Sequence, residues 1–444
     1  MIIMTYYYKS SAMLALACSG TFPIVVLADF LDKSETTVTL RNAYENVDYR
    51  SEPNSPSKLE EWGQGLILDY KSGITEGDVG AGVDVLGLWG IRLDSGGKST
   101  KANRTRSPGT MFPLETDGSA VDEFGSLGIT GKLRFKNTIV KTGTLLPQLP
   151  VIRSNNGRLL PQTYKGTQIN SSWDDFKFTG GKIEVVKSRV STNWDGMKTP
   201  GGTALSNEFY FLGGDYKVNK ELLLSYYHGN LQNYYKQHFL GLTYTVALPK
   251  GSLTLDLRDF ISDSDGKNKS KPAYASAGYY KNSATPTRGV VDNNLWSAYA
   301  AYKINSHEIG LGYQSLSGQS NFPHLNQSDG SNVYLITDAM LGRFINAGEK
   351  TWHTKYTYDF AELGAPGLSA SLLYWRGTDI RTSAGKDSEW ERQYIINYVV
   401  QSGSLKSASI SWKSSVFRTN VHPASTNRDA DDYRLTISYP ISLF

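Results

Sequence analysis

The sequence has 444 residues, with 28 Tyr, 43 Gly, 6 Met and a formal net charge of +4. A chain of this length usually forms roughly two or three soluble domains, and one large barrel is the main exception. The abundance of Tyr and Gly favours strands, tight turns and interfacial aromatic girdles over packed helices. The small net charge excludes the broad basic face that nucleic-acid binding needs, so we expect no nucleic-acid partner.

Residues 1–28 have the pattern of a secretory signal peptide. Lys9 supplies the positive charge, an apolar run reaches Ala28, and Val26-Leu27-Ala28 offers small or apolar residues to a signal peptidase. A membrane anchor is the alternative, but Ser19 to Pro23 interrupt the run. We therefore expect the mature domain to comprise residues 29–444.

The only cysteine, Cys18, lies inside this segment. A lipoprotein signal is a second alternative, although Ala15-Leu16-Ala17 is a poor match to one. Cleavage after Ala28 would leave no thiol, disulfide or Cys-ligated metal. No apolar stretch of about twenty residues follows residue 28, so the sequence predicts no transmembrane helix.

A strand expected over residues 132–145 carries cations on one face. Lys132, Arg134 and Lys136 share one parity, whereas Leu133 and Phe135 share the other. Three cations facing lipid would cost about 2–4 kcal/mol each at mid-depth, so they are expected to face water. They predict either a ladder that passes an anion along a pore or an ordinary solvated face with acidic partners opposite.

Residues 241–258 read as a β-hairpin with one apolar and one polar face. Alternating residues flank the turn Pro249-Lys250-Gly251, and similar short turns are expected at 219–220, 305–307 and 401–404. By contrast, residues 263–294 and 317–347 are long and polar connections. Short turns at one rim and long loops at the other are typical of an outer-membrane barrel.

Further cations occupy the polar parity of later strands. Each assignment depends on strand register, because a single bulge reverses parity. Asp256 shares a face with Arg258, so that pair is also expected to neutralise itself. The candidate lumen cations outside residues 132–136 are Arg41, Arg258, Lys355, Lys413 and Arg434.

The chain ends in an alternating segment, residues 434–439, and a terminal Phe444. Such an ending is expected of a signal for the barrel-assembly machinery. The sequence thus predicts an all-β protein, a single transmembrane antiparallel β-barrel with short periplasmic turns and long extracellular loops. A soluble sandwich and a solenoid are the alternatives, but the former needs apolar inward faces and the latter a fixed repeat, and neither is present.

Several motifs resemble the OprD family of outer-membrane channels, also called outer-membrane carboxylate channels. The matching segments are Glu61-Trp62-Gly63-Gln64-Gly65, residues 143–151, residues 156–163, residues 398–403 and Ser438-Tyr439-Pro440. The resemblance implies an eighteen-stranded barrel in the outer membrane that takes up small carboxylate-bearing solutes such as amino acids or organic acids. It also implies that residues 149–175 form a third extracellular loop lining the constriction.

On this basis, Arg158, Tyr164 and Lys165 are expected at the narrowest point of the pore. Asp174-Asp175 and Asp338 on the second long connection could supply opposing charge, although Asp174 and Asp175 also fit ordinary loop residues. Two departures weaken the expected basic ladder. Leu373 stands where many relatives have Arg, and Ser411 and Lys413 stand where related channels tend to carry two Arg.

Two other classes of protein are alternatives to a channel. An outer-membrane hydrolase would need a nucleophile, base and acid in reach, but the six His are scattered and no catalytic motif accompanies them. A closed-barrel adhesin or receptor that binds partners through its loops is the second alternative. We expect no catalytic residues, metal or cofactor, and the expected partners are small polar or anionic solutes, outer-membrane lipid and lipopolysaccharide.

Overall fold

The computed structural model describes residues 33–50, 56–98, 106–275, 290–325, 333–382, 385–421 and 429–443. Over these residues the chain forms one closed, antiparallel, 18-stranded barrel. This confirms the all-β barrel and its strand number. The expected signal peptide at 1–28, Cys18 and Phe444 lie outside the described residues.

The strands follow one another around the wall in chain order, apart from a two-stranded hairpin inside one loop. The barrel strands are β1 (Glu35–Tyr49), β2 (Lys58–Lys71), β3 (Val79–Ser95), β4 (Glu123–Phe135), β5 (Thr138–Leu145), β8 (Thr163–Trp173), β9 (Phe176–Lys187), β10 (Phe209–Lys217), β11 (Leu222–Leu231), β12 (Tyr235–Leu248), β13 (Gly251–Ser264), β14 (Asp292–Ile304), β15 (His307–Gly318), β16 (Lys350–Asp359), β17 (Leu368–Thr382), β18 (Gly385–Val399), β19 (Ser409–Thr419) and β20 (Ala430–Ser442). The separate hairpin is β6 (Gln148–Leu149) and β7 (Ile152–Arg153).

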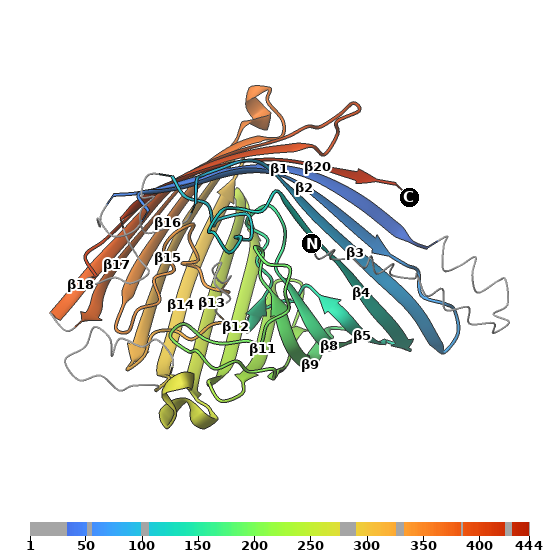
Figure 1. Ribbon diagram of the computed structural model, residues 1–444, viewed down its shortest axis with the longest axis horizontal. Helices are drawn as coiled ribbons and strands as arrows, with labels where there is room; N and C mark the ends of the chain where they lie inside the picture. The colour runs from blue at the N-terminus through green and yellow to red at the C-terminus, as the bar shows by residue number, and fades with distance from the viewer. Residues whose placement is uncertain are drawn as a thin grey trace, which may run out of the picture.

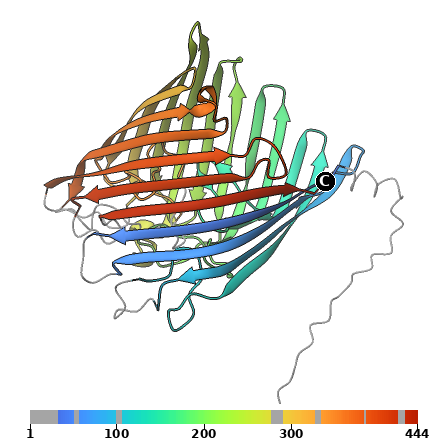
Figure 2. The ribbon, with the colours of Figure 1, turned by 90° about the horizontal axis from the view of Figure 1, so that it is seen from above.

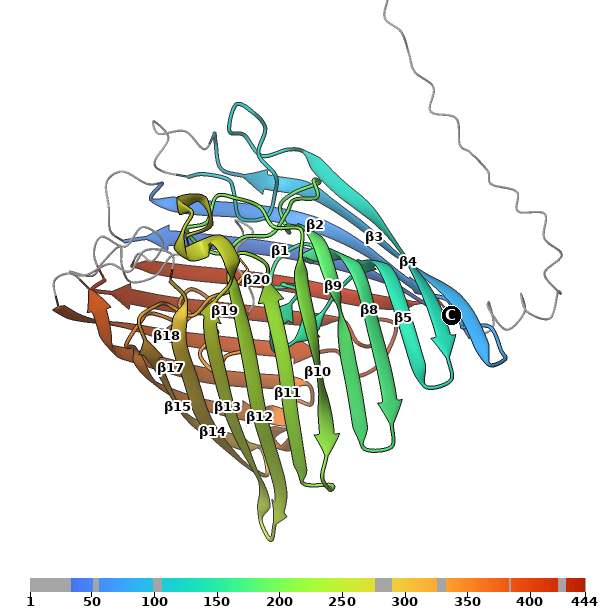
Figure 3. The same ribbon diagram turned by 90° about the horizontal axis from the view of Figure 1, so that it is seen from below.

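The barrel closes because its first and last strands pair along most of their length. β1 pairs with β20 from Thr37↔Ser442 to Tyr49↔Ala430, and with β2 on its other side. Figure 1 shows this seam as the blue strands lying beside the red ones, and Figure 2 shows the same seam from above. Figure 3 shows the remaining wall, where β8 to β18 lie as successive neighbours.

The two rims differ as expected. At one rim the connections are short, such as 136–137, 174–175, 249–250 and 305–306, and this rim faces the periplasm in outer-membrane barrels. At the other rim the connections span 96–122, 146–162, 265–291 and 319–349. The described parts of the connections include the short 3-10 helices η1 (Gly266–Lys269), η2 (Pro272–Tyr274) and η4 (Phe360–Leu363). Among the described residues, no helix is long and apolar enough to cross a membrane.

Alternation along the strands separates a lipid-facing surface from the lumen. On β4, Leu127, Ile129 and Leu133 are 68%, 58% and 57% exposed, whereas Thr130 and Lys132 between them are buried. Apolar side chains exposed on the outside of a barrel face lipid, and the opposite parity faces the lumen. The period-2 reading of the sequence therefore gives the correct face over most of this strand.

One expected strand is wrong in its length. The strand predicted over residues 132–145 ends at Phe135, and Lys136 and Asn137 form a two-residue turn before β5. Lys136 has a φ of 50°, the left-handed conformation that such tight hairpin turns require. Lys136 therefore does not continue the face of Lys132 and Arg134.

Candidate functional site

The described parts of three loops pack against the inner face of the wall. They are the β3–β4 loop (residues 96–122), the β5–β8 loop (146–162) and the β15–β16 loop (319–349). Each buries apolar side chains completely, among them Phe112, Leu159 and Phe344 at 0%, 0% and 1% exposure. Such burial fixes these parts of the loops against the wall.

Glycines on the wall make room for two of these loops. A Cβ at Gly63 would lie 2.6 Å from the Phe112 ring and 2.8 Å from Leu159 Cδ2. A Cβ at Gly65 would lie 3.2 Å from Leu159, and one at Gly90 would lie 3.2 Å from the same side chain. The alternating glycines of the 61–65 motif therefore form a flat seat on which Leu159 packs.

Glu61 in the same motif holds the β3–β4 loop. Its side chain is fully buried, and Oε2 accepts hydrogen bonds from the backbone N–H groups of Thr110 and Met111, both at 2.6 Å. Gly109 N–H and the Thr110 hydroxyl donate to the same oxygen, while Ser95 Oγ donates to Oε1. A buried carboxylate that accepts several N–H groups is a strong anchor, because charge-assisted hydrogen bonds are roughly twice as strong as neutral ones.

Glu391 on β18 holds the β15–β16 loop in the same way. Its Oε2 accepts from Gly342 N–H at 2.6 Å, and Oε1 accepts from Met340 N–H at 3.1 Å and Leu341 N–H at 3.2 Å. Gln393 and Ser415 on the wall donate to Oε1 at 2.6 Å each. Two wall glutamates thus bind the backbone of two different loops, β3–β4 and β15–β16.

A network of alternating charges joins the β5–β8 loop to the seam of the barrel. The Arg158 guanidinium contacts Glu45 Oε2 at 3.2 Å, and Arg434 contacts Glu45 Oε1 at 3.1 Å and Asp432 at 2.5 Å. Glu45 and Asp432 are 1% and 0% exposed. Removing one partner of such a network would leave a buried charge uncompensated, which is strongly destabilising.

Two further cations on this side of the lumen have no ion pair among the described residues. Arg41 donates to Asn156 Oδ1 at 2.8 Å and to the Arg158 carbonyl at 3.0 Å, so its partners are uncharged. Lys413 lies directly opposite Arg434 in the β19–β20 pairing. Arg41 and Lys413 are therefore the cations on this side of the lumen whose charge the described residues neutralise least.

The other predicted lumen cations are paired. Both guanidinium nitrogens of Arg258 reach Asp256, at 2.8 and 2.7 Å, as its shared parity indicated. Lys355 contacts Glu308 at 2.7 Å. Leu373 lies between Lys355 and Gln393 in direct register, on the face opposite the exposed Tyr374.

The cations of β4 bind the periplasmic β2–β3 turn. Lys132 is 7% exposed and contacts Asp84 at 2.5 Å and the Ser72 carbonyl at 2.8 Å. Arg134 donates to the Thr75 carbonyl at 3.0 Å. Lys132 thus has an acidic partner, which agrees with the alternative of a solvated face with acids opposite, and Lys136 lies in the turn and outside the face of the other two. A role of Lys132 and Arg134 in passing an anion stays a prediction.

The predicted third loop is also shorter than expected. Residues 163–173 form the barrel strand β8, so Tyr164 and Lys165 lie on the wall and not on the loop. Tyr164 is 2% exposed within an apolar cluster, whereas Lys165 is exposed. Asp174 and Asp175 form the turn at the opposite rim, so they cannot face Arg158 across the constriction.

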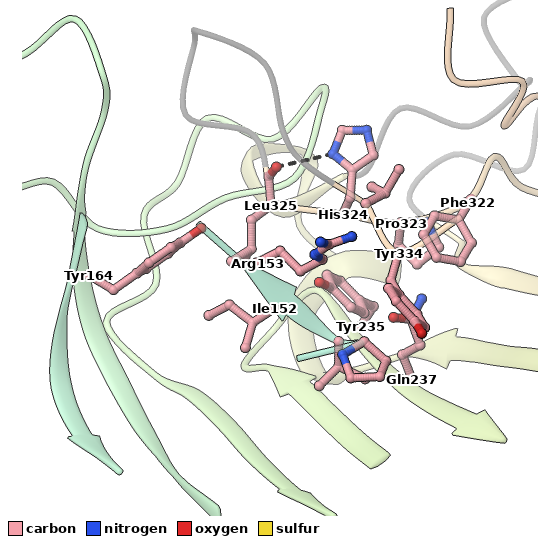
Figure 4. A pocket seen from close by; sticks show the side chains of 13 residues that line it. Ile152, Arg153, Tyr164, Tyr235, Gln237, Phe322, Pro323, His324, Leu325 and Tyr334 are labelled. Carbon is pink, nitrogen blue, oxygen red and sulfur yellow. Dashed lines mark hydrogen bonds between the residues drawn. The ribbon is translucent and has the colours of Figure 1, made fainter. Parts of the chain in front are cut away.

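A small cavity lies where the β5–β8 and β15–β16 loops meet (Figure 4). Arg153 extends into it over the Tyr334 ring at 5.3 Å, and Arg258 lies over the same ring at 3.9 Å. The His324 imidazole bonds the Leu325 carbonyl at 3.1 Å, and burial lowers the pKa of this histidine to about 3. The cavity lining therefore includes one permanent cation, Arg153, and a neutral imidazole, while Arg258 contacts the lining ring of Tyr334.

Asp338 lies in the β15–β16 loop, as predicted from the sequence. Burial raises the pKa of this carboxyl to about 6, although the charges of Arg343 and Arg153 oppose the shift. A raised pKa means that the folded loop favours the protonated form, so stability falls as pH rises from about 4 to about 6 and then levels off.

We expect Asp338→Asn to remove this pH dependence. The difference in unfolding temperature between wild type and Asp338→Asn should change steadily between about pH 4 and 6, with wild type losing stability relative to the variant. Thermal unfolding in detergent measures it. Parallel curves for the two proteins over this range would contradict the expectation.

The sequence reasoning missed the acidic half of the site, namely Glu45, Glu61, Glu391 and Asp432. Their parity on the strands was readable, since each lies on the face opposite exposed apolar residues. Only Glu61 lies in one of the motifs quoted above, and nothing in the sequence indicates which loop packs against it. All four carboxylates could have been found by selecting the Asp and Glu residues that alternate with the lipid-facing positions of each predicted strand.

The model of the family described as "outer membrane porin, OprD family" matches residues 28–443. Among curated proteins, the porin-like protein GalP of Pseudomonas putida is 32% identical over 96% of this chain and 97% of its own. Porin D of Pseudomonas aeruginosa is 30% identical over 93% of this chain and 92% of its own.

Solved structures show the same similarity. OccK8 (OprE) of Pseudomonas aeruginosa is 45% identical, with a TM-score of 0.84 over 94% of this chain and 100% of its own. OpdK of the same organism, solved with vanillate, is 31% identical, with a TM-score of 0.81 over 93% of this chain and 100% of its own.

Proposed function

The chain belongs to the OprD family of outer membrane porins, which are channels and not enzymes, and on that premise we propose that it admits small carboxylate-bearing solutes. The observation that carries the proposal is the pair of lumen cations, Arg41 and Lys413, with which no carboxylate of the described residues forms an ion pair. A solute carboxylate would supply the missing negative charge. Weak successive contacts of this kind favour passage as well as entry.

The inward loops support selection by size as well as by charge. Glu61 and Glu391 fix two loops by hydrogen bonds to the loop backbone, so the opening has a defined width. The related OpdK was solved with vanillate, an aromatic carboxylate, which agrees with this class of solute. A closed adhesin would have no use for cations left unneutralised inside its lumen.

The direct test is flux through the protein in liposomes. Small carboxylates should enter faster than neutral solutes of the same size, and amino acids, which carry both charges, should fall between them. Equal rates for matched carboxylates and neutral solutes would overturn the proposal. No flux of any solute would favour the closed adhesin or receptor.

We also propose that residues 1–28 are removed and that the mature protein begins at Asp29. The intact mass of the membrane-extracted protein should equal that of residues 29–444. A mass that includes a lipid on Cys18 would contradict this assignment.

The lumen offers positions at which carboxylate binding can be strengthened. Leu373 faces the lumen beside Lys355, and Ser411 donates to Asn397 Oδ1 at 2.6 Å on the same side. Placing Arg at both positions should lower the concentration at which a carboxylate half-blocks ion current by about tenfold, or roughly 1.4 kcal/mol. Leu373→Gln with Ser411→Gln is the uncharged control, and an equal change in both double variants would show that charge is not the cause.

A further inference from the structure

The outer wall over β16, β17 and β18 carries a cluster of cations at the loop-side end of the lipid-facing surface. It is named here the outer arginine patch, and it consists of Lys350, Arg376, Lys386 and Arg392. No solute in the lumen can reach it, so the proposed transport function does not explain it.

Strand alternation places these side chains outside the barrel. Tyr374 and Tyr394, two residues from Arg376 and Arg392, are 38% and 40% exposed on the lipid-facing surface. Glu391, the neighbour of Arg392 on the other parity, is fully buried in the lumen. Both arginines therefore point toward the membrane.

The pairing of the strands surrounds the arginines with aromatic rings. Arg376 lies directly opposite Trp352 on β16 and opposite Trp390 on β18, and Arg392 lies opposite Tyr374. Trp and Tyr gather at the level of lipid headgroups in membrane proteins. The patch therefore lies where hydrocarbon gives way to headgroups.

The protein leaves the charge of this patch largely uncompensated. Arg376 donates to Ser388 Oγ at 3.3 Å, and Arg392 lies over the Tyr394 ring at 5.2 Å. Among the described residues, neither guanidinium has a carboxylate partner. Lys350 and Lys386 share the single carboxylate of Asp379, at 3.1 and 2.8 Å.

Two other outward cations near this rim are paired. Arg418 contacts Asp431 at 2.8 Å, and Lys182 on β9 contacts Glu208 at 3.3 Å. An uncompensated guanidinium against lipid is unfavourable unless a group from the membrane neutralises it. The contrast indicates that the missing anion comes from the lipid.

We propose that the outer arginine patch binds the phosphate groups of a phosphorylated glycolipid of the outer leaflet, of the lipopolysaccharide type. Arg376 and Arg392 hold a phosphate through the paired N–H groups of the guanidinium, a geometry that suits phosphate. Trp352 and Trp390 pack against the sugar and the upper acyl chains. Lys350 and Lys386 add longer-range attraction for an anionic surface.

The test measures retention of bisphosphorylated lipid A on the detergent-purified protein by native mass spectrometry. Arg376→Gln with Arg392→Gln should weaken lipid A binding by about tenfold, and high salt should weaken it in wild type. Arg376→Lys with Arg392→Lys keeps the charge and should retain most of the binding. Lys182→Gln, an outward cation beside Tyr210 that already has a carboxylate partner, is the matched control and should bind as wild type does.

Two comparisons separate the sources of phosphate. Dephosphorylated lipid A should bind weakly to every variant, and inorganic phosphate should compete only at far higher concentration than lipid A. Equal retention by wild type and the double Gln variant, both folded by heat-dependent gel migration, would overturn the proposal. So would inorganic phosphate that displaces lipid A at matching concentration, because the site would then recognise phosphate without lipid.

Discussion

Glu391→Ala should raise single-channel conductance about twofold and admit larger solutes, because the variant loses the charge-assisted bonds that hold the β15–β16 loop, each worth about 1.5–3 kcal/mol. The carboxylate accepts hydrogen bonds from the backbone N–H groups of residues 340–342. The freed loop would leave the lumen part of the time. Recordings in planar bilayers should therefore show larger mean current and more frequent fluctuations.

Glu391→Gln provides a graded comparison. The amide keeps one acceptor oxygen but loses the charge and places an N–H₂ group against loop donors, so its conductance should fall between those of wild type and Glu391→Ala. Glu362→Ala is the matched control, since Glu362 is an exposed acid in η4 at the short-turn rim. A Glu391→Ala channel with wild-type conductance and size limit would show that apolar packing alone fixes the loop.

The barrel could be predicted from sequence because its rules are local. Alternation assigns each residue to lipid or lumen from its immediate neighbours, and turn residues such as Pro249-Lys250-Gly251 mark the short rim. The errors arose where a local irregularity intervened. The Lys136-Asn137 turn looked like a continuing strand, because both turn residues are polar and the lumen face beside them is polar as well.

The constriction was less predictable because it depends on contacts between distant segments. Arg158 lies in the β5–β8 loop, and its partner Glu45 is more than a hundred residues away in the chain. Asp174 and Asp175 looked like loop acids, yet they form a turn at the far rim. Composition cannot distinguish a lumenal loop from a turn, since both are polar.

The sequence is equally limited in predicting which lumen cations have an acidic partner. Arg258, Lys355, Lys413 and Arg434 all lie on lumen parity, but three of them have acidic partners. For Arg258 the partner was visible two residues away, while for Lys355 it lies on the neighbouring strand. Which cation stays available to a solute is therefore decided by strand register, and the residue types alone do not reveal it.

Lys413→Glu should reverse the charge at that available position and lower carboxylate flux by about tenfold, which corresponds to roughly 1.4 kcal/mol. Lys413 lies beside Arg434 on the lumen wall, with no ion pair of its own among the described residues. A fixed negative charge there repels a passing carboxylate and attracts cations, so cation permeability relative to chloride should rise. The effect should shrink at 1 M salt, where the Debye length is about 3 Å.

The control for this variant carries the same charge change outside the pore. Lys406 is exposed at the short-turn rim, so Lys406→Glu should leave ion selectivity close to that of wild type. Lys413→Arg keeps the positive charge and should preserve carboxylate flux. The flux through Lys413→Gln should lie between those of Lys413→Arg and Lys413→Glu. Reversal potentials under a salt gradient and liposome flux measure the series. If Lys413→Glu and Lys406→Glu shift selectivity equally, overall charge is responsible and Lys413 does not contact the solute.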